Sequence, residues 1–168
     1  MKATELLETL RQFHKHKLAM LRRHVVSARY VGDYDVNNTY QYVIAREEMH
    51  VSWVIDAIVD VATALGQVDP KIEDVAEPQL SVSGKNAQAT VVSQDRDEAQ
   101  QFVDKWKPIV ASLTHARHRT MLNVILGETL EHKRFFDQAV AGRTDLLGRR
   151  ADGAGTPGVV LPVRWIEQ

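Results

Sequence analysis

Two pairs of acidic and imidazole side chains stand at helical spacing within apolar patterns, and together they could bind metal. Glu47 and His50 are three residues apart, and Glu128 and His132 are four apart. Both spacings place the two members of a pair on one face of a helix. A buried carboxylate and a buried imidazole each need a partner, and a single partner that suits both groups would satisfy each pair. A metal ion suits both, and nitrogen and oxygen ligands fit iron, manganese or zinc.

Cysteine is absent from the 168-residue chain, whereas histidine occurs seven times. Disulfides, thiolate zinc sites, cysteine-ligated iron–sulfur clusters and thiol nucleophiles are therefore excluded. The 21 basic and 22 acidic side chains give a net charge of −1, which predicts no nucleic-acid partner. The N-terminus lacks the apolar core of a signal peptide, and no apolar run is long enough to span a bilayer. We therefore expect a cytoplasmic protein without a membrane partner.

Apolar residues at three- and four-residue spacing predict the helices that would position these pairs. The expected ranges are 3–30, 36–65, 95 to about 112, and about 114 to 141. Asp35 or Asn37 is expected to cap the second helix, and Ser112 or Thr114 the fourth. Pro108 is expected to kink or restart the third helix.

The segment between the second and third helices, residues 67–94, contains proline, glycine and short β-prone pieces. It predicts a long connection, with a small hairpin or as an extended strap across the bundle. The predicted fold class is all-α, with two helix hairpins joined by a long crossover. Residues 1–142 would form this four-helix bundle. Residues 143–168 would form an extended C-terminal tail, which packs on the bundle or on a neighbouring subunit of a homodimer or larger homo-oligomer.

The segments Arg46–His50 and Gly127–His132, with the long link between the hairpins, resemble the ferritin-like superfamily, in particular its rubrerythrin-like di-iron carboxylate members. The resemblance covers about residues 3–141. In that family each hairpin provides a lone Glu from one helix and a Glu-x-x-His pair from the other. The resemblance implies a ferritin-like four-helix bundle that binds two irons. It also implies an oxidoreductase or iron-handling protein that reacts with O2 or peroxide.

The fourth helix departs from this pattern, because Glu128 is followed by Glu131 at the third position and by His132 at the fourth. Each lone carboxylate is expected on the other helix of its hairpin, at the same level along the bundle as the Glu and His of the motif. Counting back through the turn by the same number of residues gives a window of positions on that helix. On the first helix this window holds His14, His16 and Lys17 but no acid, so His14 would replace one Glu. On the third helix it holds Glu98, with Asp95 close by. A mononuclear or asymmetric site is therefore as compatible with the residues as a dinuclear one. The full set of candidate ligands is Glu47, His50, Glu128, His132, Glu131, His14 and Glu98.

Two alternatives to a di-iron centre remain open. In one, Glu47, Lys17 and His50 form a buried ion cluster without metal, and the chain is a non-catalytic helical bundle that oligomerises through its apolar tail. In the other, His50, His115 and His118 bind one divalent metal, in an arrangement similar to that of DinB-like bundles. The metal content of the purified protein would distinguish these readings.

Two further histidines and two tyrosines are expected to support the structure. His16 and His24 are expected to face solvent or to bond a helix carbonyl. Tyr40 or Tyr42 lies near the site by helical spacing, and either could donate a hydrogen bond to a ligand. Plain packing is the commoner role of tyrosines at such positions.

Overall fold

Residues 2–148 are described in a computed structural model of the chain, and they fold into four long helices and one short 3-10 turn. The helices are α1 (Ala3–Ala28), α2 (Tyr34–Ala64), α3 (Ala87–Ala111) and α4 (Ala116–Val140), and the turn η1 spans Leu146–Gly148. This part of the chain contains no strand, so the predicted all-α class and the four-helix bundle are confirmed. None of these helices combines the length and apolar character needed to cross a membrane.

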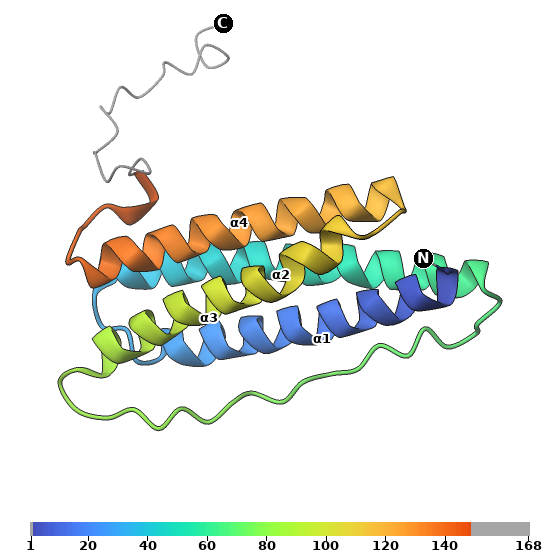
Figure 1. The fold of residues 1–168 in the computed structure, drawn as a ribbon. Helices are drawn as coiled ribbons and strands as arrows, with labels where there is room; N and C mark the ends of the chain where they lie inside the picture. The colour runs from blue at the N-terminus through green and yellow to red at the C-terminus, as the bar shows by residue number, and fades with distance from the viewer. Residues whose placement is uncertain (1, 149–168) are drawn as a thin grey trace, which may run out of the picture.

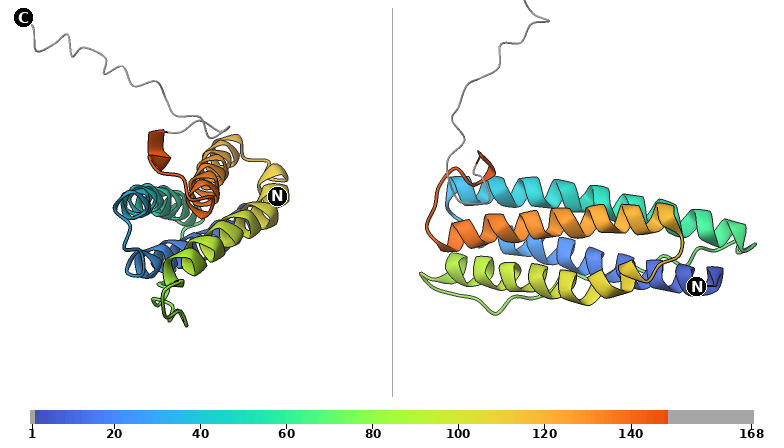
Figure 2. Two further views of the ribbon diagram at one scale, coloured as in Figure 1. Left: turned by 90° about the vertical axis from the view of Figure 1, so that its left-hand side faces the viewer. Right: turned by 45° about the horizontal axis from the view of Figure 1, so that its top comes forward.

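The four helices form two hairpins that pack side by side. α1 packs on α2 and α3 packs on α4, while α1 also contacts α3 and α2 also contacts α4 (Figure 1). Figure 2 shows the four helices around a common axis, with α1 and α4 at opposite corners. An interior side chain of α1 can therefore meet side chains from the three other helices.

The connection between α2 and α3, residues 65–86, lies along α1 and is called the strap below (Figure 1). Arg11 of α1 donates hydrogen bonds to the carbonyl oxygen of Pro70, at 2.8 and 3.0 Å. Lys15 forms an ion pair with Glu73 at 2.6 Å. The strap contains no strand pairing, so the small hairpin considered from the sequence is not formed.

α3 begins at Ala87, two turns before the predicted start at Asp95. The β-branched residues just before Asp95 favour a strand by propensity, but Val91 and Val92 are buried in the core. They continue the helical spacing of the buried face, and packing of that face overrides the local preference. Pro108 lies inside α3, which continues to Ala111 without the predicted restart.

The helix caps also differ from the expected residues. Asp33 caps α2, rather than Asp35 or Asn37, and its Oδ1 accepts a hydrogen bond from the backbone N–H of Val36 at 3.0 Å. The N-cap of α4 is His115, which follows both expected residues and makes no side-chain capping bond. Each correction shifts a boundary by only a few residues and leaves the buried faces unchanged.

The described residues form three apolar clusters, and the two with the most residues, called the larger and the smaller cluster below, lie toward opposite ends of the bundle. The third, formed by Leu18, Leu21 and Val51, lies between α1 and α2. In the larger cluster the ring of Phe13 packs edge-on against Phe102 and Trp106, with centroids 5.3 and 4.9 Å apart. In the smaller cluster Tyr40 packs against Phe136, with centroids 5.2 Å apart. The middle of the bundle, between the two clusters, holds the polar side chains described in the next section.

The segment after α4 folds back on the bundle. Leu146, in η1, is only 1% exposed and belongs to the smaller apolar cluster. The predicted tail of residues 143–168 therefore does not start as an extended segment. Its remainder, residues 149–168, lies outside the described residues, and with it the predicted packing on the bundle or on a second subunit.

We predict that Asp33→Ala lowers the free energy of unfolding by about 1 kcal/mol, because the backbone N–H of Val36 loses its capping oxygen. Urea denaturation measures the change. The exposed Asn38→Ala variant, in the same helix, is the control and is expected to lose nothing, since alanine is the better helix former. Equal losses in the two variants would contradict the capping role.

Candidate functional site

A buried lysine occupies the centre of the bundle. Lys17 of α1 is 0% exposed, and its Nζ lies 2.7 Å from Oε1 of Glu47 on α2. The same Nζ lies 3.2 Å from the hydroxyl oxygen of Thr129 on α4 and 5.2 Å from the ring centroid of Phe102 on α3. A single ammonium therefore contacts one residue from each of the other three helices. Lysine is almost never fully buried without a charged partner, and Glu47 provides one.

The second oxygen of Glu47 accepts a hydrogen bond from Nδ1 of His24, at 2.7 Å. Burial alone would raise the pKa of Glu47, but the nearby charges of His24 and Lys17 outweigh it and hold the pKa below its usual range. Burial also opposes a charge on His24, yet the Glu47 carboxylate raises the pKa of this imidazole above its ordinary value. The expectation of a solvent-facing or carbonyl-bound His24 is therefore wrong, because this side chain is buried against Glu47.

Glu128 belongs to a second cluster, between α2 and α4. Arg46 binds its carboxylate in a bidentate manner, with nitrogen–oxygen distances of 2.7 to 3.0 Å. Nε2 of His50 donates a further hydrogen bond at 2.8 Å. Burial would raise the pKa of Glu128, but the hydrogen bonds from Arg46 and His50 lower it. The Glu128 carboxylate is thus neutralised by a guanidinium from the neighbouring helix.

Two uncharged imidazoles lie beside these clusters. The rings of His50 and His132 are stacked with centroids 6.1 Å apart, and both side chains are buried. Burial, aided by the charge of Lys17, lowers the pKa of His50, and burial lowers that of His132 to about 3. The Nδ1 atom of each ring is buried without a hydrogen-bond partner among residues 2–148.

Asp95 forms a third cluster, near the smaller apolar cluster. The hydroxyl of Tyr40 donates to Oδ2 of Asp95 at 2.6 Å, and Nε of Arg23 donates to Oδ1 at 2.6 Å. Burial and the Asp95 charge raise the pKa of Tyr40. Tyr40 therefore bonds Asp95 and not a candidate ligand, while the ring of Tyr42 packs edge-on against His132, with centroids 6.4 Å apart.

Four of the seven candidate ligands meet in the middle of the bundle, and three do not. Glu131 pairs with Arg134 at 3.2 Å on the outer side of α4. Glu98 pairs with Arg23 at 3.2 Å, and His14 is buried beside the strap and lines a separate cavity. The four that meet are Glu47, His50, Glu128 and His132.

The three-histidine alternative is not assembled in this fold. His115 and His118 lie together at the start of α4, with ring centroids 4.2 Å apart. His50 instead bonds Glu128 of α4. Glu128 lies ten residues after His118 on that helix, which corresponds to about 15 Å along its axis. His118 is buried.

The residues at the centre do not fit the two-metal carboxylate site that the resemblance implies. Both oxygens of Glu47 are bonded by Lys17 and His24, and both oxygens of Glu128 are bonded by Arg46. Within residues 2–148, no three histidine, aspartate or glutamate side chains are grouped so that they could hold a metal ion.

Thr129 is the residue whose importance the sequence reasoning missed. It stands three residues before His132, where a second Glu-x-x-His motif would have its glutamate. Its hydroxyl faces the Lys17 ammonium at 3.2 Å. The three-residue spacing between Thr129 and His132 could have indicated this role. The four-residue spacing between Glu128 and His132 led instead to the pairing of that histidine with Glu128.

No protein-family model matches this chain, and neither a curated protein nor a solved structure shows significant similarity to it. The fold and the contacts alone define its class. The described residues form an all-α four-helix bundle whose polar centre is built around an internal lysine.

We predict that Lys17→Met destabilises the protein by about 3–5 kcal/mol, because it leaves Glu47 buried without its ammonium partner. Glu47→Leu is expected to cost a similar amount, and the double variant less than the sum, with a coupling energy of about 2 kcal/mol or more. Denaturant unfolding measures all three. Lys15→Met, which removes an exposed ion pair, is the control and should change stability by about 1 kcal/mol at most. Additive single effects would refute a direct pairing.

We predict that the stability contributed by His24 decreases as the pH rises. The pKa of His24 is raised in the folded protein, so its stabilisation is fully present below the unfolded value of about 6.5 and is lost as the pH rises through the folded value. The difference in unfolding free energy between the wild type and His24→Phe should therefore shrink as the pH rises above about 6.5. An NMR titration gives the midpoint of His24 directly, and a midpoint below that of a free histidine would contradict the assignment.

Proposed function

We propose that this chain is a ferritin-like four-helix bundle in which the Lys17 ammonium takes the place of the metal, and that it acts as a metal-independent, non-catalytic binding module. The observation that carries this proposal is the fully buried contact between Nζ of Lys17 and Oε1 of Glu47, at 2.7 Å. The ammonium is a cation that the chain itself provides, so the site needs no metal ion from solution.

The proposal is supported by the residues that surround this ammonium. Metal-binding carboxylate bundles take one Glu from each of two helices and a Glu-x-x-His pair from each of the other two. Here the side chains that meet at the same level, one per helix, are Lys17, Glu47, Phe102 and Thr129. Only one of the four is a carboxylate. A bundle with this interior keeps the shape of the metal-binding class without its ligand set.

A second candidate function is supported by the two imidazoles next to the centre. The Nδ1 atoms of His50 and His132 are buried and lack hydrogen-bond partners within residues 2–148. Neutral imidazole is the form that binds metal, so these two rings could bind one ion of iron, manganese or zinc, with Glu128 joining them only after a side-chain rearrangement, because the three are not grouped as ligands in the structure. Binding would require Arg46 to release the Glu128 carboxylate. In this candidate a bound iron or manganese would supply the redox chemistry toward O2 or peroxide, whereas zinc would not.

Metal retention distinguishes the two candidates. The purified protein is incubated with Fe²⁺ without oxygen, or with Mn²⁺ or Zn²⁺, then desalted and subjected to elemental analysis. We predict fewer than about 0.1 ion per chain in the wild type. A Lys17→Glu/Thr129→Glu variant, which adds two carboxylates beside Glu47, should retain about one ion or more and should melt at a higher temperature with metal than without. Lys15→Glu, an exposed change on α1 that matches the Lys17→Glu step in charge, is the control and should gain no metal.

The same measurement can contradict the proposal in two ways. Retention of one ion per wild-type chain that is lost in His50→Ala and in His132→Ala would establish the second candidate instead. Retention of two irons per chain that is lost in Glu47→Gln would establish the dinuclear centre.

A further inference from the structure

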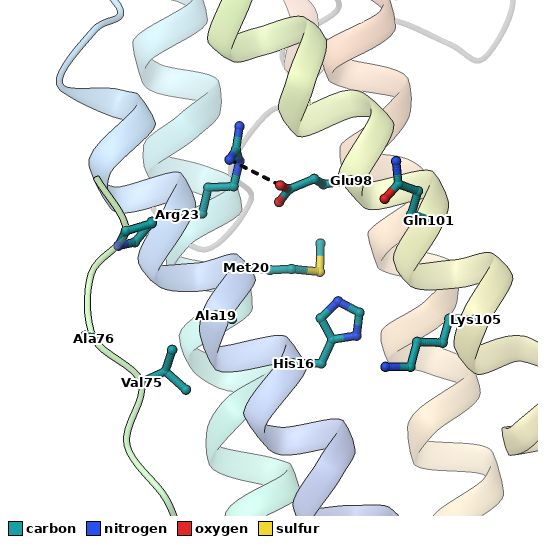
Figure 3. Close-up of a pocket in the computed structure, with 10 residues that line it drawn as sticks. His16, Ala19, Met20, Arg23, Val75, Ala76, Glu98, Gln101 and Lys105 are labelled. Carbon is teal, nitrogen blue, oxygen red and sulfur yellow. Dashed lines mark ion pairs between the residues drawn. The ribbon is translucent and has the colours of Figure 1, made fainter. Parts of the chain in front are cut away.

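A cavity of about 580 Å³ lies between α1, α3 and the strap, away from the bundle centre (Figure 3). We propose that it binds a small organic monocarboxylate with an apolar body, and that the carboxylate lies between His16 of α1 and Lys105 of α3. The site does not involve Glu47, His50 or the candidate metal ligands beside them. The proposal is therefore independent of whether the centre of the bundle binds metal.

His16 presents a fixed hydrogen-bond donor at this cavity. The indole N–H of Trp106 donates to Nδ1 of His16 at 2.9 Å, so the proton of the neutral ring is on Nε2. The ring of Phe102 packs edge-on against the imidazole, with centroids 4.8 Å apart. Burial, aided by the charges of Lys105 and Lys17, lowers the pKa of His16 to about 4. The ring is therefore neutral near pH 7, and it is held inside the bundle surface and not turned to solvent as the sequence suggested.

Lys105 provides the positive charge for an anionic ligand. Its Nζ lies 5.2 Å from the ring centroid of Trp106, and within residues 2–148 no carboxylate forms an ion pair with it. In Figure 3 the side chain extends from α3 toward His16 across the cavity. An ammonium beside an N–H donor is a favourable arrangement for a carboxylate, because both hydrogen bonds to the anion are charge-assisted.

The opposite end of the cavity favours one carboxylate over two. Glu98 lies there and forms an ion pair with Arg23 at 3.2 Å (Figure 3). Arg23 also donates to Asp95 at 2.6 Å, so its charge is already balanced. A second anionic group on the ligand would meet the Glu98 carboxylate with no free cation beside it. This charge distribution selects a monocarboxylate.

The space between the two ends is suited to an apolar body. Met20, which is only 3% exposed, and Ala19 contribute apolar surface from α1, and Val75 and Pro78 contribute it from the strap. Exposed ion pairs link α1 to the strap on both sides of Val75, at 3.2 and 3.1 Å. The cavity volume falls within the range of small-molecule sites, in which a few polar groups orient a mainly apolar ligand.

The indole N–H of Trp106 gives a direct readout, because it donates to the imidazole that would contact the ligand. The full chain, labelled with ¹⁵N, is titrated with 4-phenylbutyrate, and the Trp106 indole resonance is assigned from the Trp106→Phe spectrum. We predict a saturable shift with a dissociation constant of about 1 mM or below. The neutral analogue 4-phenylbutanamide should bind at least about tenfold more weakly, since it lacks the charge that Lys105 recognises.

Two lysine variants test the location of the site. Lys105→Gln should weaken 4-phenylbutyrate binding at least about fivefold, and Lys107→Gln, an exposed change on the same helix outside the cavity, should leave it unchanged. Both side chains are exposed, so both variants are expected to fold. The proposal is overturned by the absence of a saturable shift up to about 20 mM, by equal affinity for the amide, or by equal losses in the two variants.

Discussion

The contact between the Lys17 ammonium and the Glu47 carboxylate is the constraint on which the rest of the interior depends. Both side chains are 0% exposed, so neither charge can be satisfied by bulk water. Breaking such a pair leaves an uncompensated charge in a medium of low polarity. The pair is favourable only if other polar groups bond the remaining carboxylate oxygen and the remaining ammonium protons. His24 and Thr129 do this, one at the carboxylate and one at the ammonium.

This contact also limits how the helices can slide along one another. Lys17, Glu47 and Thr129 come from α1, α2 and α4, so a shift of any one helix by a turn would separate the ammonium from a partner. An apolar interior tolerates such shifts more easily, because one aliphatic contact replaces another. The two other carboxylate clusters add the same kind of constraint between α1, α2 and α3 at Asp95, and between α2 and α4 at Glu128.

The helical spacing of apolar residues was sufficient to predict the fold class, and the ends of α1, α2 and α4 within a few residues. It also placed Glu47 and His132 correctly on buried faces, since burial depends on the residues of the same helix. The predicted start of α3 is wrong because the β propensity of Val91 and Val92 favours an extended segment. These residues instead continue the buried face of the helix.

The partners of the buried groups could be predicted less well than their burial. Lys17 was considered as the counter-ion of Glu47, because reflection through the turn brings the two to one level. His24 was missed, since its Nδ1 reaches Glu47 from two helical turns beyond Lys17. The Arg46 contact to Glu128 depends on the rotation of α2 against α4, and spacing within one helix carries no information about that rotation.

The charges at the centre disfavour a bound cation, and they also affect the cavity at α1 and α3. Lys17 and, when it is protonated, His24 place two positive charges beside the single carboxylate of Glu47. A divalent cation at the same place would add to this excess, because among residues 2–148 no second carboxylate contacts Lys17. The same excess acts at a distance, since the Lys17 charge is among the causes that lower the pKa of His16. The internal lysine thereby helps to keep that imidazole neutral, which is the state in which its Nε2–H can donate while Trp106 donates to Nδ1. The residue proposed to take the place of a metal at the centre thus also supports the anion site proposed at the side of the bundle.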